Sequence, residues 1–323
     1  MTNLPGALRD RLETALWPFA LDVEQRTDRD TTRKWLFRTP DGSSIEAVLM
    51  GYPKRTTLCI SSQAGCAMAC TFCATGQFGF ERHLEAGEIV AQVAYANASL
   101  RADPMPTSPA NVTNIVFMGM GEPLANMDRV EESLRRMIEV MGIGARSITV
   151  STVGVVPGIR RLAKTPWQVN LAISLHAADD ELRSELVPLN RRYPIADLIA
   201  AAQEYFDAKG RRISIEWTLM AGRNDTDEQA RKLAGIARLL RAHVNVINLN
   251  PTPLSPDRPA SPERVDRFMD ALEAAGANAT LRDTRGQDID AACGQLRLKQ
   301  ATAVESPIVL GIKDGEGDRR GAG

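Results

Sequence analysis

The sequence contains no long apolar run. Its first ten residues are polar, and the apolar stretch 16–21 is too short for the hydrophobic region of a signal peptide. No segment approaches the ~20 apolar residues that a membrane-spanning helix needs. We therefore expect a cytoplasmic protein without a membrane partner.

An excess of charge of either sign is also missing. Lysine and arginine total 39 and aspartate and glutamate total 40, which gives a formal net charge of −1. This balance excludes a polycationic coat for nucleic acid, but it leaves room for a local basic groove. Candidates for phosphate contacts are four arginine pairs, each of which is more often a solvated surface: Arg135-Arg136, Arg160-Arg161, Arg191-Arg192 and Arg211-Arg212.

Cysteine is scarce. The 323 residues include five cysteines, too few for a disulfide scaffold in a chain of this length. In a reducing compartment, clustered cysteines more often mark metal or redox chemistry. Hydrophobic residues make up 44% and charged residues 24%, as expected for a globular protein with a core of its own.

Short apolar runs alternate with amphipathic segments through most of the chain. The expected strands are 57–61, 114–118, 147–151, 169–175, 213–220, 244–249 and 278–282, and the expected helices are 86–100, 129–141, 156–163, 195–208, 227–242 and 262–275. This alternation is typical of βαβ units and a parallel sheet. We predict an α/β fold with a full or partial barrel, or alternatively an open doubly wound sheet. Functional residues should lie at the carboxyl ends of the strands.

Three cysteines form a Cys-x3-Cys-x2-Cys array directly after the first of these strands: Cys66, Cys70 and Cys73. A structural zinc site normally takes four protein ligands, and no fourth cysteine or histidine lies within the loop. Three thiolates on a 4Fe–4S cluster leave one iron open for a small molecule. The array favours such a cluster over a zinc site or a redox thiol group.

The array is the hallmark of radical S-adenosylmethionine (SAM) enzymes, which this sequence resembles. The resemblance implies a parallel barrel, a 4Fe–4S cluster in the loop after the first strand, and SAM at the open iron. Residues 118–123 (Met-Gly-Met-Gly-Glu-Pro) follow the second predicted strand. The glycines allow a close approach of backbone to ligand, and Glu122 can pair with an ammonium group. We expect a contact with the methionine part of SAM, rather than an ordinary loop.

The remaining cysteines extend this resemblance. Cys59 and Cys293, taken alone, are more often buried structural thiols. Yet residues 46–296 as a whole resemble the RlmN/Cfr group of radical SAM RNA methyltransferases, and all five cysteines fall on positions that this group uses. The other matching segments are 57–66, 118–123, 147–157, 174–176, 243–253 and 282–296. Pro123 and residues 283–286 (Asp-Thr-Arg-Gly) resemble the RlmN type.

The resemblance implies a role for each matching residue. Cys66, Cys70 and Cys73 would hold the cluster. Cys293 would carry the methyl group as S-methylcysteine, and Cys59 would resolve the covalent adduct with RNA. Glu46 matches the proton acceptor of the group, although by itself it reads as an exposed strand carboxylate. The positions that bind SAM in this group are occupied here by Gly121, Glu122, Ser151, Ser174, Leu175, His176 and Asn250.

The implied reaction is methylation of carbon C2 of an adenosine in 23S rRNA, which uses two molecules of SAM. Some members of the RlmN type also modify tRNA, and reduced ferredoxin or flavodoxin would donate the electron to a monomeric enzyme. One alternative is the methylation of C8 by Cfr-type members. A second alternative is a radical SAM oxidoreductase or maturase that acts on a non-RNA substrate. A third is a non-catalytic zinc or RNA-binding module.

Three regions are expected along the chain. Residues 1–51 would combine a remnant of the group's N-terminal accessory domain, with a helix at 8–21, and a β-hairpin whose strands 32–37 and 44–50 flank a Pro-Asp-Gly turn. Residues 52–287 would form the radical SAM core, a partial (βα)6 barrel of the TIM type. Residues 288–323 would carry the loop of Cys293 and a disordered tail.

Overall fold

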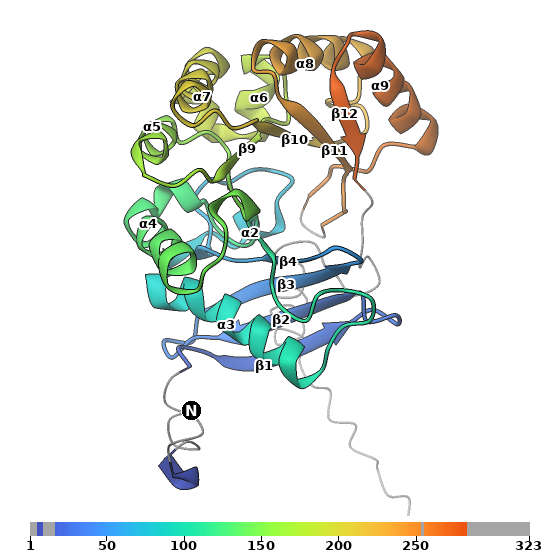
Figure 1. Ribbon diagram of the computed structural model, residues 1–323. Helices are drawn as coiled ribbons and strands as arrows, with labels where there is room; N and C mark the ends of the chain where they lie inside the picture. The colour runs from blue at the N-terminus through green and yellow to red at the C-terminus, as the bar shows by residue number, and fades with distance from the viewer. Residues whose placement is uncertain (1–4, 9–16, 253–254, 283–323) are drawn as a thin grey trace, which may run out of the picture.

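One sheet organises the fold of the protein, which a computed structural model describes for residues 5–8, 17–252 and 255–282 (Figure 1). Its ten strands follow the order β1-β2-β3-β4-β7-β8-β9-β10-β11-β12, and β5 pairs separately with β6. The strands are β1 (Ala20–Arg26), β2 (Thr32–Arg38), β3 (Ser44–Tyr52), β4 (Arg55–Cys59), β5 (Gln63–Gly65), β6 (Phe80–His83), β7 (Asn114–Phe117), β8 (Ile148–Thr152), β9 (Asn170–Ser174), β10 (Ser214–Leu219), β11 (His243–Asn248) and β12 (Asn278–Leu281).

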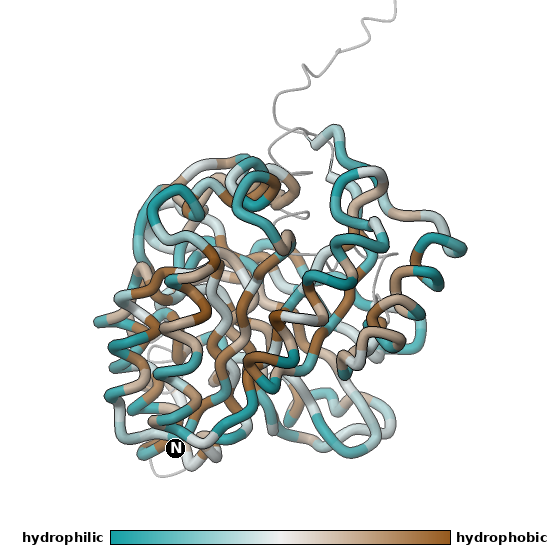
Figure 2. The backbone as a smooth tube through the Cα atoms, turned by 90° about the horizontal axis from the view of Figure 1, so that it is seen from above, coloured by the Kyte–Doolittle hydropathy of each residue, from teal (hydrophilic) through white to brown (hydrophobic). Residues whose placement is uncertain are grey.

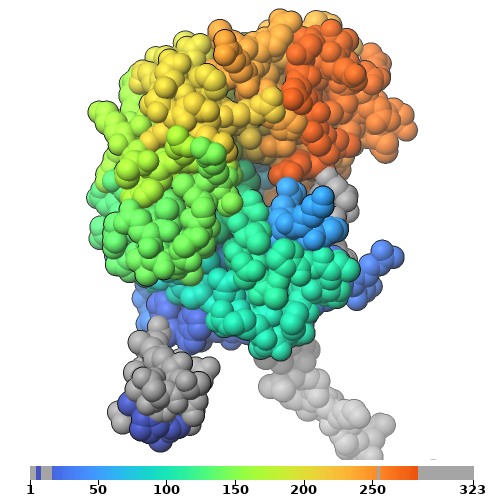
Figure 3. Space-filling model, viewed as in Figure 1, coloured from blue at the N-terminus to red at the C-terminus, as the bar shows by residue number. Residues whose placement is uncertain are grey.

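The helices lie on the outer side of this curved sheet and follow one another around it in chain order (Figures 1 and 3). They are α3 (Ala86–Ala102), α4 (Met127–Arg135), α5 (Val156–Lys164), α6 (Asp180–Leu186), α7 (Ile195–Lys209), α8 (Asp227–Leu239) and α9 (Pro262–Ala274), whereas the short α2 (Ala74–Gln77), between β5 and β6 in the chain, is not part of this outer layer. From β4 onward, neighbouring strands of the large sheet are parallel. The predicted α/β fold with a partial barrel is therefore confirmed.

The helices pack on the sheet through apolar residues that recur at helical spacing. In α7, Ile195, Leu198, Ala202 and Tyr205 are buried, and the Tyr205 hydroxyl donates to the backbone oxygen of Val169 beneath it (2.6 Å). Seen from above, apolar segments concentrate on the strands and the inner helix faces (Figure 2). Within the described ranges, no helix is both long and apolar enough to cross a membrane.

The predicted hairpin continues the barrel sheet as an antiparallel extension. β2 pairs with β3, and β3 pairs with β4 in a register that sets Val48 opposite Cys59. Helix α3 covers one face of this extension, where the ring of Tyr95 meets Trp35 and Phe37 edge-on. The opposite face carries Glu46, because side chains alternate along a strand.

Some elements differ from the predicted ones. The prediction of a helix at 8–21 is wrong at its C-terminal end, where Ala20 and Leu21 begin β1. This strand forms because it pairs with the edge of β2. Helix α8 ends before the predicted residue 242, and Arg241 has a positive φ of 49°. The short elements β5, β6 and α6 have no clear periodicity in the sequence, because each owes its form to tertiary contacts.

The chain after β4 and the chain after β7 run side by side. Ser62 and Gln63 both donate backbone hydrogen bonds to the oxygen of Met120 (2.8 and 3.1 Å), and Gly119 donates to Ile60 (3.0 Å). A Cβ at position 119 would collide with the backbone of Ile60. At Gly121, φ is +99° and a Cβ would lie 2.5 Å from the Cβ of Gln63. The two glycines thus allow the two strand ends to meet.

Replacing Gly119 with alanine should push the two strand ends apart. We expect Gly119→Ala to lower the free energy of unfolding by about 1–3 kcal/mol, as overpacking of a fixed backbone does, in urea unfolding of the metal-free protein. Gly235→Ala is the matched control, because a Cβ on this glycine of α8 meets nothing within 4 Å. It should be neutral or stabilising by about 0.4–1 kcal/mol. Equal stability of the two variants would show that the close approach is not needed.

Candidate active site

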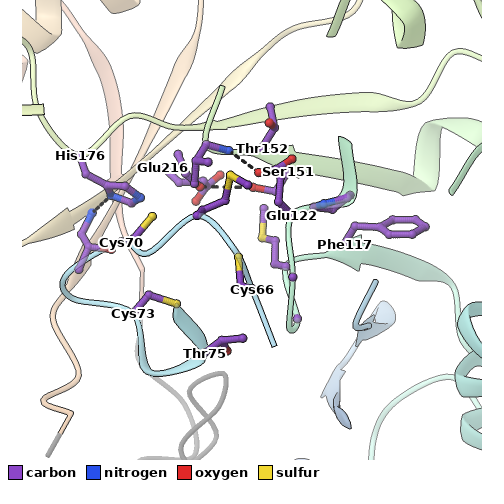
Figure 4. A pocket seen from close by; sticks show the side chains of 18 of the residues that line it. Cys66, Cys70, Cys73, Thr75, Phe117, Glu122, Ser151, Thr152, His176 and Glu216 are labelled. Carbon is purple, nitrogen blue, oxygen red and sulfur yellow. Dashed lines mark hydrogen bonds between the residues drawn. The ribbon is translucent and has the colours of Figure 1, made fainter. Parts of the chain in front are cut away.

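The carboxyl ends of the parallel strands surround one pocket (Figure 4). The cysteine loop, residues 66–73, forms one wall, and the ends of β7, β8, β9 and β10 form the other. The predicted functional residues that line it are Cys66, Cys70, Cys73, Gly121, Glu122, Ser151, Ser174 and His176. The fold thus gathers residues that are far apart in the sequence, at the edge of the sheet where we expected them.

Backbone contacts hold the cysteine loop at both sides. The N–H of Cys66 donates to the oxygen of Gly79 (2.8 Å), just after Gly65, whose φ of +73° and closeness to the same oxygen exclude a side chain. Further on, the N–H of Thr71 donates to the oxygen of Leu186 (3.2 Å) at the end of α6. Main-chain hydrogen bonds to Gly79 and Leu186 therefore help to set the shape of the loop.

The thiols of this loop suit a cluster. Burial raises the pKa of Cys66 to about 12 and that of Cys70 well above its usual value, and the neighbouring Cys73 adds to both shifts. Ionised thiolates at these positions need the positive charge of a metal centre. In the described part of the chain, no three His, Cys, Asp or Glu side chains converge closely enough for one metal ion. Three thiols from one short loop, with no fourth Cys or His within it, fit a 4Fe–4S cluster better than a structural zinc site, which normally takes four protein ligands.

Glu122 lies buried opposite the cysteine loop. Its carboxylate accepts hydrogen bonds from the backbone N–H groups of Leu124 (3.0 Å) and Val153 (2.8 Å), while its own N–H donates to the side chain of Gln63 (2.8 Å). Burial nevertheless raises its pKa to about 7. A cationic group in the pocket would favour the ionised carboxylate, so Glu122 can bind an ammonium group there.

His176 lies in the pocket as a neutral imidazole. Its Nδ1 accepts a hydrogen bond from the backbone N–H of Thr218 (3.0 Å), which leaves the proton of the neutral ring on Nε2. Burial, and the positive charge of Arg183, lower its pKa to about 3. The ring packs edge-on against Phe72 of the cysteine loop, and the backbone of His176 has a φ of +59°. His176 can therefore donate to a ligand but not titrate near neutral pH.

The other predicted SAM-binding residues divide into two groups. Ser151 and Ser174 end neighbouring strands, with hydroxyl oxygens 3.4 Å apart at the pocket wall. Leu175 is buried and donates its N–H to the backbone oxygen of Glu216 (3.1 Å), and Asn250 is half-buried after β11. Neither of the latter two lines the pocket.

Glu216 is a pocket residue that the sequence analysis missed. It lies buried on β10, accepts a hydrogen bond from the side-chain amide of Asn245 on β11 (2.8 Å), and has a pKa raised by burial. The available signal was one carboxylate within the apolar run 213–220. Together with Glu122, Glu216 makes the pocket a site for a ligand that carries positive charge.

Cys59 and Glu46 lie on one face of the sheet, outside the pocket lining. Val48 faces Cys59 across β3 and β4, so Glu46, two residues earlier on β3, lies on the same face. The interpretation of Glu46 as an exposed carboxylate is wrong. It is buried and forms an ion pair with the equally buried Lys34 (Nζ–Oε2 3.0 Å).

Two sets of predicted residues lie elsewhere. Cys293 is outside the described residues. Among the arginine pairs, Arg211 precedes β10, at the end of the sheet opposite the pocket, and donates to Asn170. The pairs at 135–136 and 160–161 form ion pairs with carboxylates of the outer helices. Only the pair at 191–192, which is exposed and follows α6, stays a candidate among the four for phosphate contact on the pocket side.

Comparison with known proteins agrees with this site. The Radical SAM superfamily model matches residues 60–234. The probable dual-specificity RNA methyltransferase RlmN of Chloroflexus aurantiacus is 51% identical over 308 residues, which cover 92% of this chain and 81% of that protein. The protein of the same name from Streptomyces griseus is 49% identical over 301 residues, 91% of this chain and 82% of the relative.

A solved structure is similar as well. The crystal structure of a radical SAM methyltransferase from Sphaerobacter thermophilus superposes with a TM-score of 0.85 at 52% sequence identity, covering 91% of this chain and 86% of that one. Identity of this order over nearly the whole chain, together with the shared fold and the cysteine loop at the strand ends, shows the family. The chain belongs to the RlmN family of the radical SAM superfamily, methyltransferases that depend on a 4Fe–4S cluster and S-adenosylmethionine.

Proposed function

We propose that this enzyme methylates carbon C2 of an adenosine in 23S rRNA, and also in tRNA, through an S-methylcysteine intermediate. The relatives of about 50% identity are named dual-specificity RNA methyltransferases. The observation that carries the proposal is the common pocket of the three-cysteine loop and Glu122. Mass spectrometry of rRNA and tRNA from a strain without the gene, before and after the gene is restored, tests it. Loss of 2-methyladenosine supports C2 methylation, and loss of 8-methyladenosine instead contradicts it.

In this proposal Cys66, Cys70 and Cys73 would hold the cluster, which when bound would supply the electron for the cleavage of SAM into methionine and a 5′-deoxyadenosyl radical. Glu122 pairs with the ammonium group of SAM. Ser151, Ser174 and the Nε2–H of the neutral His176 are placed to hydrogen-bond with its polar groups. The partly buried, apolar ring of Phe72 in the loop would keep water from the reactive end.

The target carbon explains the need for two further thiols. An sp² carbon of adenine is not nucleophilic, so Cys293 first takes the methyl group by polar displacement. The 5′-deoxyadenosyl radical would take a hydrogen atom from the S-methyl group, and the methylene radical would add to C2 of adenine. The adduct would then return one electron to the oxidised cluster and lose the C2 proton to a base. The Cys59 thiolate would attack the sulfur of Cys293 to form a disulfide, while the electron pair of the broken carbon–sulfur bond goes to the methylene carbon, which takes up a proton and becomes the methyl group of the released RNA. Cys59 is suited to this step because it is a free, partly exposed thiol at the end of β4.

Glu46 is the proposed proton acceptor at adenine C2. Its place on the same sheet face as Cys59 supports the role, since both residues would act on one adduct. The ion pair with Lys34 holds the carboxylate in one place inside the protein. An external ferredoxin or flavodoxin would supply the electron to the monomer.

The cluster assignment makes a first prediction. Alanine in place of Cys66, Cys70 or Cys73 should abolish a stable 4Fe–4S centre after anaerobic reconstitution, because two thiolates cannot hold it. Iron and sulfide analysis with electron paramagnetic resonance measures this. Cys59→Ala is the control and should load iron like the parent. Full loading of the variant with all three cysteines replaced would contradict the assignment.

The thiol pair makes the sharpest prediction. Cys293→Ala should eliminate RNA methylation while the cluster still forms. Cys59→Ala should instead accumulate protein joined to RNA, because no thiol remains to break the thioether. The product is a slowly migrating band on a denaturing gel that nuclease removes and thiol reductant does not release. Methylation at the parent rate by either variant would show that the two-thiol mechanism is wrong here.

The role of Glu46 makes a third prediction. Glu46→Gln keeps the shape of the side chain but cannot accept the proton, so RNA methylation should fall at least about 100-fold, the size of a typical general-base effect. Cluster content and S-methylation of Cys293 should stay at the parent level, since neither uses this carboxylate. The parallel Glu204→Gln variant, on the outer surface of α7, controls for loss of charge. A Glu46→Gln enzyme that methylates RNA like the parent excludes the role.

A further inference from the structure

Arg183 is a completely buried cation that does not line the pocket. It lies in α6, directly behind the end of β9. Its Nε donates to the backbone oxygen of Leu175 (3.0 Å) and its Nη1 to the side-chain oxygen of Asn190 (2.8 Å). Its Nη2 donates to the backbone oxygens of Val153 (2.6 Å) and Ser174 (3.4 Å). These acceptors are all neutral.

The charge of Arg183 therefore has no carboxylate partner in contact with it. Within the described residues, no aspartate or glutamate oxygen lies within 4.0 Å of the guanidinium. Asp180 acts on it from the same helix, but Asp180 is exposed and its carboxylate already accepts from Asn190 and Ile195. Burial lowers the pKa of Arg183 to about 10, so it still carries its charge at neutral pH. A buried charge of this kind is unfavourable unless a negative group offsets it.

The negative charge that offsets Arg183 can come from ligands bound at the cysteine loop. Helix α6 supports the loop, because Leu186 accepts the N–H of Thr71 and packs in one apolar cluster with Cys70. Arg183 lies three residues before Leu186 on α6, so the guanidinium is carried by the helical turn on which Cys70 packs. Glu122 is linked to the same point, since Val153 donates its N–H to Glu122 and offers its oxygen to Arg183. That carboxylate, however, faces the pocket and its ligand.

A cluster with three thiolates carries net negative charge, and one-electron reduction increases it. The charge would form in a water-poor site, where electrostatic interactions are strong. The reduction potential of an iron–sulfur cluster depends on the net charge around it. A fixed cation behind the loop favours the reduced state over the oxidised state.

We propose that Arg183 is the counter-charge of the cluster, and that it raises the reduction potential so that an external iron–sulfur or flavin protein can deliver the electron. This proposal rests on the cluster assignment of the proposed function. Arg183 is then a positioning residue, because it touches neither SAM nor the reacting atoms. Its backbone contacts keep the cation fixed while the pocket is filled and emptied.

The test compares cluster potentials in reconstituted, fully loaded protein. Arg183→Gln removes the charge and keeps an N–H donor for the backbone oxygens, and Arg183→Lys keeps the charge and loses the planar fork. Potentiometric titration followed by electron paramagnetic resonance, with a low-potential chemical reductant, gives the midpoint. We expect a more negative midpoint for Arg183→Gln and a midpoint near the parent for Arg183→Lys. Arg160→Gln, an exposed arginine paired with Glu204 on the outer helices, should leave the midpoint unchanged.

Each other outcome has a distinct meaning. A loaded Arg183→Gln protein with the parent midpoint overturns the proposal but not the cluster assignment. If Arg183→Gln takes up no cluster while Arg183→Lys does so with a midpoint near the parent, the charge is needed even for retention, which supports the proposal. If both variants fail to load, Arg183 is only a structural clamp and the proposal is wrong. A parent protein that binds no 4Fe–4S cluster overturns the proposed function itself.

Discussion

The close backbone approach of residues 60–63 to residues 119–121 is the constraint on which the site depends. Hydrogen bonds between these two stretches leave no room for a Cβ at Gly119 or Gly121. The cysteine loop follows the first stretch in the chain, and Glu122 directly follows the second. Their distance is therefore fixed by main-chain geometry, and no flexible side chain has to reach across the pocket to bring them together.

Charge burial is the second organising feature of the barrel mouth. Glu122, Glu216 and Arg183 are ionisable groups in a region with little access to water. Each accepts or donates hydrogen bonds with neutral partners. The opposite charge of Arg282 also acts on Glu216 from nearby, as that of Asp180 acts on Arg183. Such a site favours charged ligands over neutral ones, because a ligand of opposite charge offsets the cost of each buried charge.

The sequence predicted the barrel strands and helices well, because their apolar patterns are long and regular. It also predicted that the cysteine loop and the glycine-rich segment lie at the carboxyl ends of the strands, where both line the pocket. It did not predict β1, which forms on an available strand edge, or Glu216, whose carboxylate reads as an ordinary strand residue until the fold places it. The sequence did not predict the burial of Glu46 either, because its ion-pair partner Lys34 lies on another strand. Tertiary pairing, rather than local pattern, determines all three.

The shared ladder of β2, β3 and β4 limits how this protein can change during evolution. The side chains of Glu46 and Cys59 occupy one face only because the pairing of Val48 with Cys59 is kept. The insertion or deletion of a single residue within β3 would turn Glu46 toward α3 and leave an apolar side chain beside the thiol. Length variation among homologues should thus gather in the turns at 39–43 and 53–54, whereas the strands between them keep a constant number of residues.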